Sequence, residues 1–167
     1  MNLIVNVTEN WGIGQEGHLL VSIPVDLQRF RKLTTGRTVI LGRKTLETFP
    51  EGRPLRGRRN LILSGNPSFY VNGATVVHSL TELREAVLPG EPLSVIGGAS
   101  IYELFLPYCE TAFVTKTFTT SPADRFFPNL DLLPDWEPVC LSEVFEENGL
   151  RFQYTDYVNK NVRSFWE

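Results

Sequence analysis

Two adjacent cations that follow a glycine are the first candidates for binding chemistry. Arg43 and Lys44 come after an apolar run at positions 38–41 and after Gly42, which lets the backbone turn. This arrangement suits a phosphate group, because free N–H groups at a helix start and basic side chains both attract an anion. The run Leu63-Ser64-Gly65-Asn66 repeats the pattern with a hydroxyl in place of the cations. Either run is equally typical of an ordinary strand–turn–helix junction.

Asp26 is the candidate for acid–base chemistry. It falls in the first turn of a helix that Pro24 is suited to open, among the apolar side chains of Ile23, Val25 and Leu27. A carboxylate in an apolar cleft can pair with an amidine-like N–C–N edge through two hydrogen bonds and can take part in proton transfer. The competing interpretation is an acid placed favourably near a helix N-terminus.

Paired glycines mark a third candidate site. Gly97 and Gly98 end an apolar run, which allows a ligand to approach the backbone closely. Ligands bind at this edge of open α/β sheets, although a pair of glycines is also compatible with a tight turn and nothing more. The segment lacks the GxGxxG dinucleotide fingerprint, and so does Gly12-Ile13-Gly14. A standard Rossmann fold is therefore disfavoured.

Basic side chains are concentrated in one arm of the sequence. Residues 29–59 carry a net charge of +8, whereas the rest of the chain carries −11, for a total of −3. The arginine-rich run at 52–59 lies within this arm, and one of its arginines can clamp a carboxylate in bidentate fashion. This asymmetry suggests an anionic partner, and the alternative is a solvated basic face without a ligand. Nucleic acid is disfavoured, because no aromatic residue interrupts the run and the whole chain is acidic.

Strand-like and helix-like segments alternate along the chain and must position these candidates. Strands are predicted at 3–7, 38–41, 60–63, 74–77, 93–96, 112–119, 139–145 and 150–158, and helices at 24–35, 43–49, 80–87 and from 99 to before Pro107. Residues 9–17 are rich in glycine and predict a loop. The last two strands form a hairpin around Glu147-Asn148-Gly149. The order predicts an α/β fold with a mostly parallel, helix-covered sheet and an antiparallel edge.

Composition excludes several classes of protein. A chain of 167 residues with 42% hydrophobic residues can bury a core, which excludes intrinsic disorder. No apolar run approaches the roughly 20 residues needed to cross a bilayer, and the N-terminus does not resemble a signal peptide. We therefore expect a cytoplasmic protein with no membrane partner. Two cysteines 31 positions apart and two histidines fit neither a disulfide framework nor a metal site.

Taken together, the motifs and their order resemble the dihydrofolate reductase family over almost the whole chain. Each motif is weak alone, but the ordered set is specific. The matching segments are Ile4-Val5-Asn6-Val7, Gly12-Ile13-Gly14, Pro24-Val25-Asp26-Leu27, Val39-Ile40-Leu41-Gly42-Arg43-Lys44-Thr45, Gly52-Arg53-Pro54-Leu55-Arg56-Gly57-Arg58, Asn60-Leu61-Ile62-Leu63-Ser64, Ile96-Gly97-Gly98-Ala99-Ser100-Ile101-Tyr102 and Asp124-Arg125-Phe126-Phe127-Pro128.

The resemblance implies a fold and an activity. The expected fold is a mixed, mostly parallel eight-stranded sheet flanked by helices, in one domain over residues 1–167. Residues from about 37 to 90 would form an adenosine-binding subdomain within it. The expected activity is the reduction of 7,8-dihydrofolate by NADPH, with hydride transfer to C6 and protonation at N5. The expected protein is a monomer that also binds antifolate inhibitors.

The resemblance also implies roles for individual residues. Asp26 is the expected active-site acid, and Thr115 supports it. Arg58 would receive the glutamate carboxylate, and residues 9–23 would form a mobile loop that closes over the site. The expected substrate-binding residues are Ile4, Val5, Asn6, Asp26, Leu27, Phe30, Leu55, Arg58, Ile96 and Thr115. The expected cofactor-binding residues are Asn6, Ile13, Gly14, Gly42, Arg43, Lys44, Thr45, Leu63, Ser64, Gly65, His78, Gly97, Gly98, Ala99, Ser100, Ile101 and Tyr102.

Several positions depart from the family pattern. Leu20-Val21 stands where the family usually has Pro-Trp, and Asn6 stands where a small alanine is usual. Leu46 replaces a tryptophan and is expected to pack in the core or in the wall of the site, and Gly65 lacks a basic side chain. These departures keep two alternatives open: a related pterin or riboflavin-pathway reductase, and a non-catalytic relative that binds pterin or NADPH. Asp26 and the arginine-rich run favour the folate enzyme.

Overall fold

The computed structural model describes residues 1–167 and contains two β-sheets. The strands of the larger sheet lie in the order β10-β11-β8-β1-β7-β4-β5-β6, and the smaller sheet has the order β3-β2-β9. The strands are β1 (Asn2–Val7), β2 (Gly12–Gln15), β3 (His18–Leu19), β4 (Thr38–Gly42), β5 (Arg59–Leu63), β6 (Thr75–Val77), β7 (Leu93–Gly97), β8 (Thr111–Thr117), β9 (Arg125–Phe126), β10 (Trp136–Glu147) and β11 (Leu150–Asn159). The helices are α1 (Pro24–Thr34), α2 (Arg43–Glu47), α3 (Leu80–Ala86) and α4 (Ala99–Phe105), and the 3₁₀ turns are η1 (Pro50–Gly52), η2 (Leu106–Tyr108) and η3 (Leu130–Leu132).

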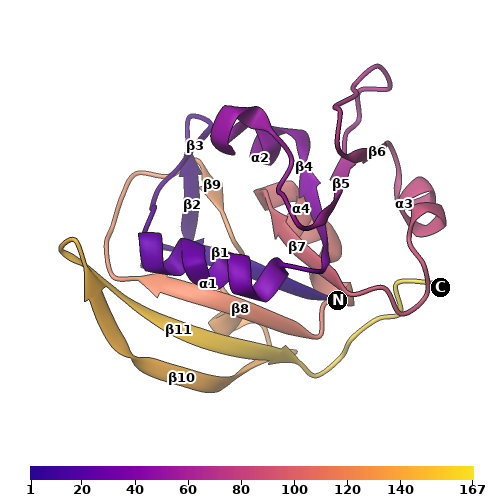
Figure 1. Cartoon of the computed structure of the whole chain (residues 1–167). Helices are drawn as coiled ribbons and strands as arrows, with labels where there is room; N and C mark the ends of the chain where they lie inside the picture. The colour runs from indigo at the N-terminus through magenta and orange to yellow at the C-terminus, as the bar shows by residue number, and fades with distance from the viewer.

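The larger sheet is parallel except at one edge. The six strands from β8 to β6 pair in parallel, whereas β11 pairs antiparallel with both β8 and β10. The β10–β11 hairpin forms the lower edge in Figure 1. It turns at Asn148 and Gly149, whose φ angles of 53° and 79° suit a two-residue hairpin turn. The predicted α/β fold class with an antiparallel C-terminal hairpin is therefore confirmed.

Successive side chains of the central strands pack in two different hydrophobic clusters, one on each face of the sheet. Ile40 of β4 belongs to the larger cluster, whereas its neighbours Val39 and Leu41 belong to the smaller one. The smaller cluster also takes in Phe30 of α1 and the buried Leu46 of α2, as the sequence predicted for Leu46. Because side chains alternate along a strand, this cluster marks the sheet face that α1 covers over β1 and β8 (Figure 1).

The small sheet differs from the sequence-based expectation of a loop over residues 9–17. Strand β2 pairs antiparallel with β3 and with the distant β9. Asp124, next to β9, accepts a hydrogen bond from Glu16 N–H at 2.9 Å and donates its own N–H to the Gly14 carbonyl at 3.0 Å. The partner segment lies 108 residues away in sequence from Glu16, so local residue preferences cannot reveal the pairing.

Helix α3 begins as the sequence predicted. The Ser79 side chain accepts a hydrogen bond from Glu82 N–H, which satisfies a donor that the helix start leaves free. The Glu82 carboxylate accepts from His78 N–H at 2.7 Å, one residue earlier than in the usual reciprocal cap. The longest helix, α1, has 11 residues, and none has the length and apolar character to cross a membrane.

Candidate functional site

The two glycine-containing strand ends meet at one edge of the large sheet. Strands β4 and β7 are neighbours, and Leu41 pairs with Gly97. Gly97 has a φ of +132°, and a Cβ atom built there would lie 3.2 Å from the Thr45 hydroxyl oxygen. A Cβ on Gly98 would lie 3.3 Å from the same atom. Glycine at these positions lets α2 and β7 approach closely, so the two candidate motifs form one site.

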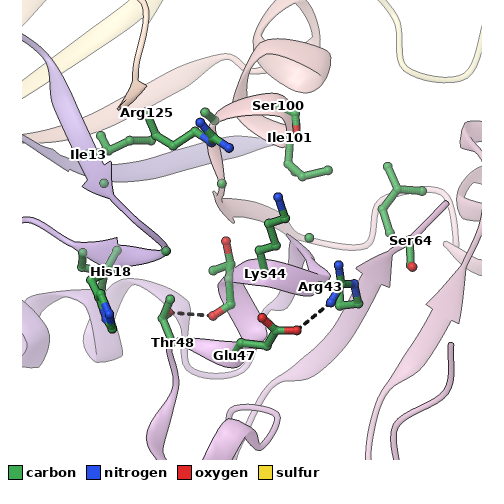
Figure 2. A pocket seen from close by; sticks show the side chains of 18 of the residues that line it. Ile13, His18, Arg43, Lys44, Glu47, Thr48, Ser64, Ser100, Ile101 and Arg125 are labelled. Atoms are coloured by element: carbon green, nitrogen blue, oxygen red, sulfur yellow. Dashed lines mark hydrogen bonds and ion pairs between the residues drawn. The ribbon is translucent and has the colours of Figure 1, made fainter. Parts of the chain in front are cut away.

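A cleft of about 720 Å³ opens at this edge. Four groups of residues line it: the β2–β3 hairpin, the ends of β4 and β5 with α2, the first part of α4 with Gly98 before it, and Arg125 of β9. The lining residues are Ile13, Gly14, Gln15, Gly17, His18, Leu19, Gly42, Arg43, Lys44, Thr45, Glu47, Thr48, Leu63, Ser64, Gly65, Gly98, Ala99, Ser100, Ile101, Glu103 and Arg125. Figure 2 shows that the labelled side chains converge on the cleft from these separate elements.

Cations border the cleft from opposite sides. Arg43 Nη1 lies 2.7 Å from Glu47 Oε1, so this arginine is paired within α2. The Lys44 amine points into the cleft, and Arg125 extends from β9 toward Ser100 (Figure 2). The Arg125 guanidinium donates to the carbonyl oxygen of Asp124 at 3.0 Å. A polyanionic ligand suits this arrangement, because cations meet it on both sides.

Asp26 lies where the first turn of α1 faces β1 and β8. Pro24 opens the helix, and the Val25 N–H donates to Glu147 Oε2 at 3.2 Å. The Asp26 carboxylate accepts a hydrogen bond on each oxygen. Thr115 Oγ1 donates to Oδ1 at 2.7 Å, and Asn6 Nδ2 donates to Oδ2 at 3.0 Å. The acid is therefore bound to the sheet rather than serving only as a helix-start charge.

Apolar residues near Asp26 form a wall. Phe30, Leu55 and Ile96 all pack in the smaller hydrophobic cluster, although they come from three distant parts of the chain. Leu27 is 51% exposed, so its side chain is available to a ligand. Ile4 is buried and shares a face of β1 with Asn6, whereas the predicted substrate residue Val5 points to the opposite face and packs in the larger cluster. The structure thus brings together an acid and the apolar surface that a flat aromatic ring would need.

Arg58 is held in position by its neighbours. Its Nε donates to the Arg56 carbonyl oxygen at 2.8 Å, and its Nη1 donates to Thr34 Oγ1 at 3.1 Å at the end of α1. Partial burial lowers the pKa of the Arg58 guanidinium, and the nearby Arg31 lowers it further. The cost of holding two cations together favours binding of an anion at this position.

Most of the predicted cofactor-binding residues line the cleft, but four do not: Asn6, Gly97, His78 and Tyr102. Tyr102 is buried, and its hydroxyl donates to the Ile4 carbonyl oxygen at 2.7 Å. Burial raises the pKa of this phenol, which therefore stays a neutral donor inside the protein. Gly97 is buried behind Gly98, and His78 Nδ1 lies 2.8 Å from the Ser64 carbonyl oxygen.

Four cleft residues carried no role in the sequence-based prediction: Glu47, Thr48, Glu103 and Arg125. Glu47 lies one turn after Arg43, so its spacing in the predicted helix could have revealed it. Arg125 belongs to a recognised motif, but its place in the cleft depends on the pairing of β9 with β2. No local signal in the sequence indicates that pairing.

The fold and this site define a class of protein. A cleft lined by cations at the carboxyl edge of a mostly parallel α/β sheet is typical of proteins that bind phosphorylated ligands there. The dihydrofolate reductase family model matches residues 1–159. The chain belongs to the dihydrofolate reductase family.

Individual relatives agree with this assignment. Dihydrofolate reductase from Bacillus subtilis (strain 168) is 33% identical over 163 residues, which cover 96% of this chain and 95% of the relative. The enzyme from Mycobacterium tuberculosis (strain ATCC 25618 / H37Rv) is 36% identical over 149 residues, covering 87% and 89%. A solved structure of dihydrofolate reductase from Enterococcus faecalis, complexed with NADP(H) and RAB-propyl, has a TM-score of 0.82 at 30% identity. It covers 95% of both chains.

These comparisons confirm the family and the fold class that the ordered motifs implied. They also confirm the class of enzyme, an NADPH-dependent oxidoreductase that acts on dihydrofolate. The alternative of a riboflavin-pathway reductase is not favoured. The roles of the individual site residues are predictions.

Proposed function

We propose that the chain reduces 7,8-dihydrofolate to tetrahydrofolate with the site built by α1, the carboxyl edge of the sheet and the cationic cleft. The observation that carries this proposal is the Asp26 carboxylate, which accepts one hydrogen bond from β8 and one from β1. Its remaining lone pairs suit the N3–H and 2-amino edge of a pterin, because each carboxylate oxygen accepts two hydrogen bonds.

The cleft residues fit NADPH, which supplies the hydride when it is bound. The glycines at the ends of β4 and β7 let these strands pack closely against Ile101 and Thr45, and the cleft that the dinucleotide would occupy opens beside them. Arg43 and Lys44 would hold its 2′-phosphate, with Ser64 and His78 beside them. Residues from about 37 to 90 would bind the adenosine half. Because NADH lacks the 2′-phosphate that Arg43 and Lys44 would hold, we expect a strong preference for NADPH over NADH.

The apolar wall and Arg58 complete the substrate site. Phe30, Leu55 and Ile96 would pack against the flat part of the substrate, and Arg58 would bind its glutamate α-carboxylate. Antifolate inhibitors that present the same donor edge to Asp26 would occupy the same position. We place the protein in the cytoplasm, a location that its two free cysteines support.

The experiment that tests this function is the Asp26→Asn variant with dihydrofolate and NADPH. An amide cannot accept both donors of the pterin edge, so we expect turnover near neutral pH to fall about 10²–10⁴-fold. NADPH binding, measured by fluorescence titration, should stay close to that of the wild type. Turnover at the wild-type rate would restrict Asp26 to a structural role in α1. Absence of NADPH oxidation by the wild-type protein at any pH would instead indicate a non-catalytic binding protein.

A further inference from the structure

The Asp26 carboxylate is hydrogen-bonded to Asn6, whose amide is in turn hydrogen-bonded to the Thr117 hydroxyl. In the parallel pairing of β1 with β8, Asn6 lies opposite Thr115, and Thr117 follows two residues further along β8. Side chains two residues apart point to the same face of a sheet. Asn6, Thr115 and Thr117 therefore lie on the sheet face that Asp26 of α1 contacts, and each of them takes part in a hydrogen bond there.

The carboxylate determines which end of the Asn6 amide faces it, because an ionised carboxylate only accepts hydrogen bonds, and the Thr117 hydroxyl holds the other end of the amide. Thr117 has no exposed surface, so its hydroxyl must find a partner within the protein. It donates to Asn6 Oδ1 at 2.8 Å, which leaves the Nδ2 group to donate to Asp26 Oδ2 at 3.0 Å. The reversed amide would place an oxygen against the carboxylate. The hydrogen bonds therefore have one direction, from Thr117 through Asn6 to Asp26.

This direction matters because an aspartate carboxylate rotates freely on its own. The terminal torsion of aspartate has a broad energy profile, so one hydrogen bond does not fix the carboxylate plane. Thr115 holds Oδ1 at 2.7 Å from β8, and Asn6 holds Oδ2 from β1. Two donors from two strands define the plane. They also leave one lone pair on each oxygen for a ligand with two parallel N–H groups.

We propose that Asn6 is a positioning residue that orients the Asp26 carboxylate toward the pterin edge, and that Thr117 acts on Asp26 through Asn6. The family resemblance implied that Asn6 binds the substrate and the cofactor directly. The geometry assigns it a different role, because its carbonyl and one N–H are already engaged within the protein. The kinetic readout rests on the proposed function, whereas the binding readout below does not.

The test compares Asn6→Ala, Thr117→Val, Thr117→Ser and the double variant Asn6→Ala/Thr117→Val. The single-turnover rate of hydride transfer to dihydrofolate and the Kd values of dihydrofolate and NADPH are measured for each. Loss of a hydrogen bond to a charged group typically costs about tenfold or more. We expect Asn6→Ala to lower the rate about tenfold and to weaken dihydrofolate binding, with the Kd of NADPH changed by less than about twofold.

The Thr117 variants test transmission through Asn6. Thr117→Val keeps the shape but removes the hydroxyl, so we expect a smaller loss in the same direction, and Thr117→Ser should restore the rate. In the Asn6→Ala background, Thr117→Val should have no further effect, because the residue through which it acts is gone. Thr155→Val is the matched control: this buried β11 threonine has a hydroxyl without a hydrogen-bond partner. Its rate should equal that of the wild type.

Three results would overturn the proposal. The first is a double variant whose rate falls by the product of the two single-variant factors, which indicates that Asn6 and Thr117 act independently. The second is an equal loss of NADPH and dihydrofolate affinity in Asn6→Ala, which indicates a direct cofactor contact. The third is an unchanged rate in Asn6→Ala. If the wild type itself does not reduce dihydrofolate, the proposed function fails. The affinity of each variant for a 2,4-diaminopyrimidine then still decides whether Asn6 orients Asp26.

Discussion

The ion pair between Arg43 and Glu47 affects how the cleft meets a phosphate. The two side chains are 41% and 61% exposed and lie one turn apart on α2. Exposed pairs of this kind contribute only about 0.3–0.5 kcal/mol, so a phosphate can readily displace the glutamate from Arg43. Glu47 nevertheless remains in the cleft as a negative charge. If Arg43 binds the 2′-phosphate as we propose, Glu47 opposes the binding of the group that distinguishes NADPH from NADH.

We therefore expect Glu47→Gln to tighten NADPH binding several-fold and to leave NADH binding nearly unchanged, as measured by fluorescence titration at low salt. Arg43→Ala should do the opposite and weaken NADPH binding selectively. Glu103→Gln, which removes a cleft carboxylate on α4, serves as the control for a general change of charge. Equal tightening of both cofactors by Glu47→Gln would place Glu47 away from the 2′-phosphate.

At the scale of elements, the small sheet gives the cleft its outer wall. Strand β9 pairs with β2, and the Arg125 stem lies over Gly14, where a Cβ atom would be 3.5 Å from the Arg125 Cβ. This contact directs the guanidinium toward the start of α4 (Figure 2). Arg125 faces Lys44 across the cleft rather than extending the cationic run of α2. A ligand between them would meet Arg125 at a part other than its 2′-phosphate.

Replacement of Arg125 by alanine should therefore weaken NADPH and NADH binding by similar factors, about tenfold each, since a charge-assisted hydrogen bond is lost in both complexes. The ratio of the two Kd values, from parallel titrations, is the decisive measurement. Arg151→Ala is a control, because Arg151 is an exposed arginine of β11 that does not line the cleft. If only the Kd of NADPH changed, Arg125 would instead contact the 2′-phosphate.

Strands β4 and β5 are joined at their starts by a carboxylate. Glu91 accepts hydrogen bonds from Thr38 Oγ1 at 2.7 Å and from Arg59 Nη1 at 2.8 Å, and Thr38 pairs with Arg59 in the sheet. Burial by itself would raise the pKa of the Glu91 carboxyl. The hydrogen bonds from Thr38, Arg59 and the Leu88 N–H outweigh burial, so the net pKa is lowered below its ordinary value of 4.5.

A lowered pKa in the folded state means that the ionised form stabilises the protein at neutral pH. This contribution is lost as the pH falls below the unfolded-state value of about 4.5. We expect Glu91→Gln to lower the free energy of unfolding by about 1–3 kcal/mol at pH 7, as measured by urea denaturation. The difference from the wild type should shrink at pH 3. A difference that stays constant with pH would show that packing, not charge, makes the contribution.

At the scale of the whole molecule, the ligand sites connect separate segments of the chain. The cleft takes residues from the β2–β3 hairpin, α2, the end of β5, α4 and β9. Asp26 and its partners lie on α1, β1 and β8. A cofactor bound in the cleft would therefore connect elements that come from distant parts of the chain. Since a ligand that binds only the native state shifts unfolding by mass action, NADPH should stabilise the whole fold.

At a free NADPH concentration of 100 times its Kd, the stabilisation amounts to about 2.7 kcal/mol. For a chain of this size, that free energy raises Tm by about 5–10 °C in a thermal unfolding experiment. The same concentration of NADH should give a smaller rise, because it lacks the phosphate that Arg43 and Lys44 would bind. An equal rise with both cofactors would contradict the assigned role of these cations.

Sequence alone determined the features that depend on neighbouring residues and on motif order. The strand ends at Gly42 and Gly97, the turn at Asn148-Gly149 and the start of α3 at Ser79 all follow from local preferences, and the structure has them. The placement of Asp26 in the first turn of α1 was predicted from Pro24 in the same way. The ordered motifs identified the family, because a set of weak signals in one order is specific.

Only the tertiary structure decided which distant residues meet. The pairing of β2 with β9 places Arg125 in the cleft, and the register of β1 against β8 places Asn6 between Thr117 and Asp26. These contacts join residues from 20 to 114 positions apart in the chain. Hydrophobic periodicity specifies which face of a strand is buried, but it carries no information about which strand lies beside it. Partner choice depends on the packing of the whole core, so these contacts became visible only in the folded molecule.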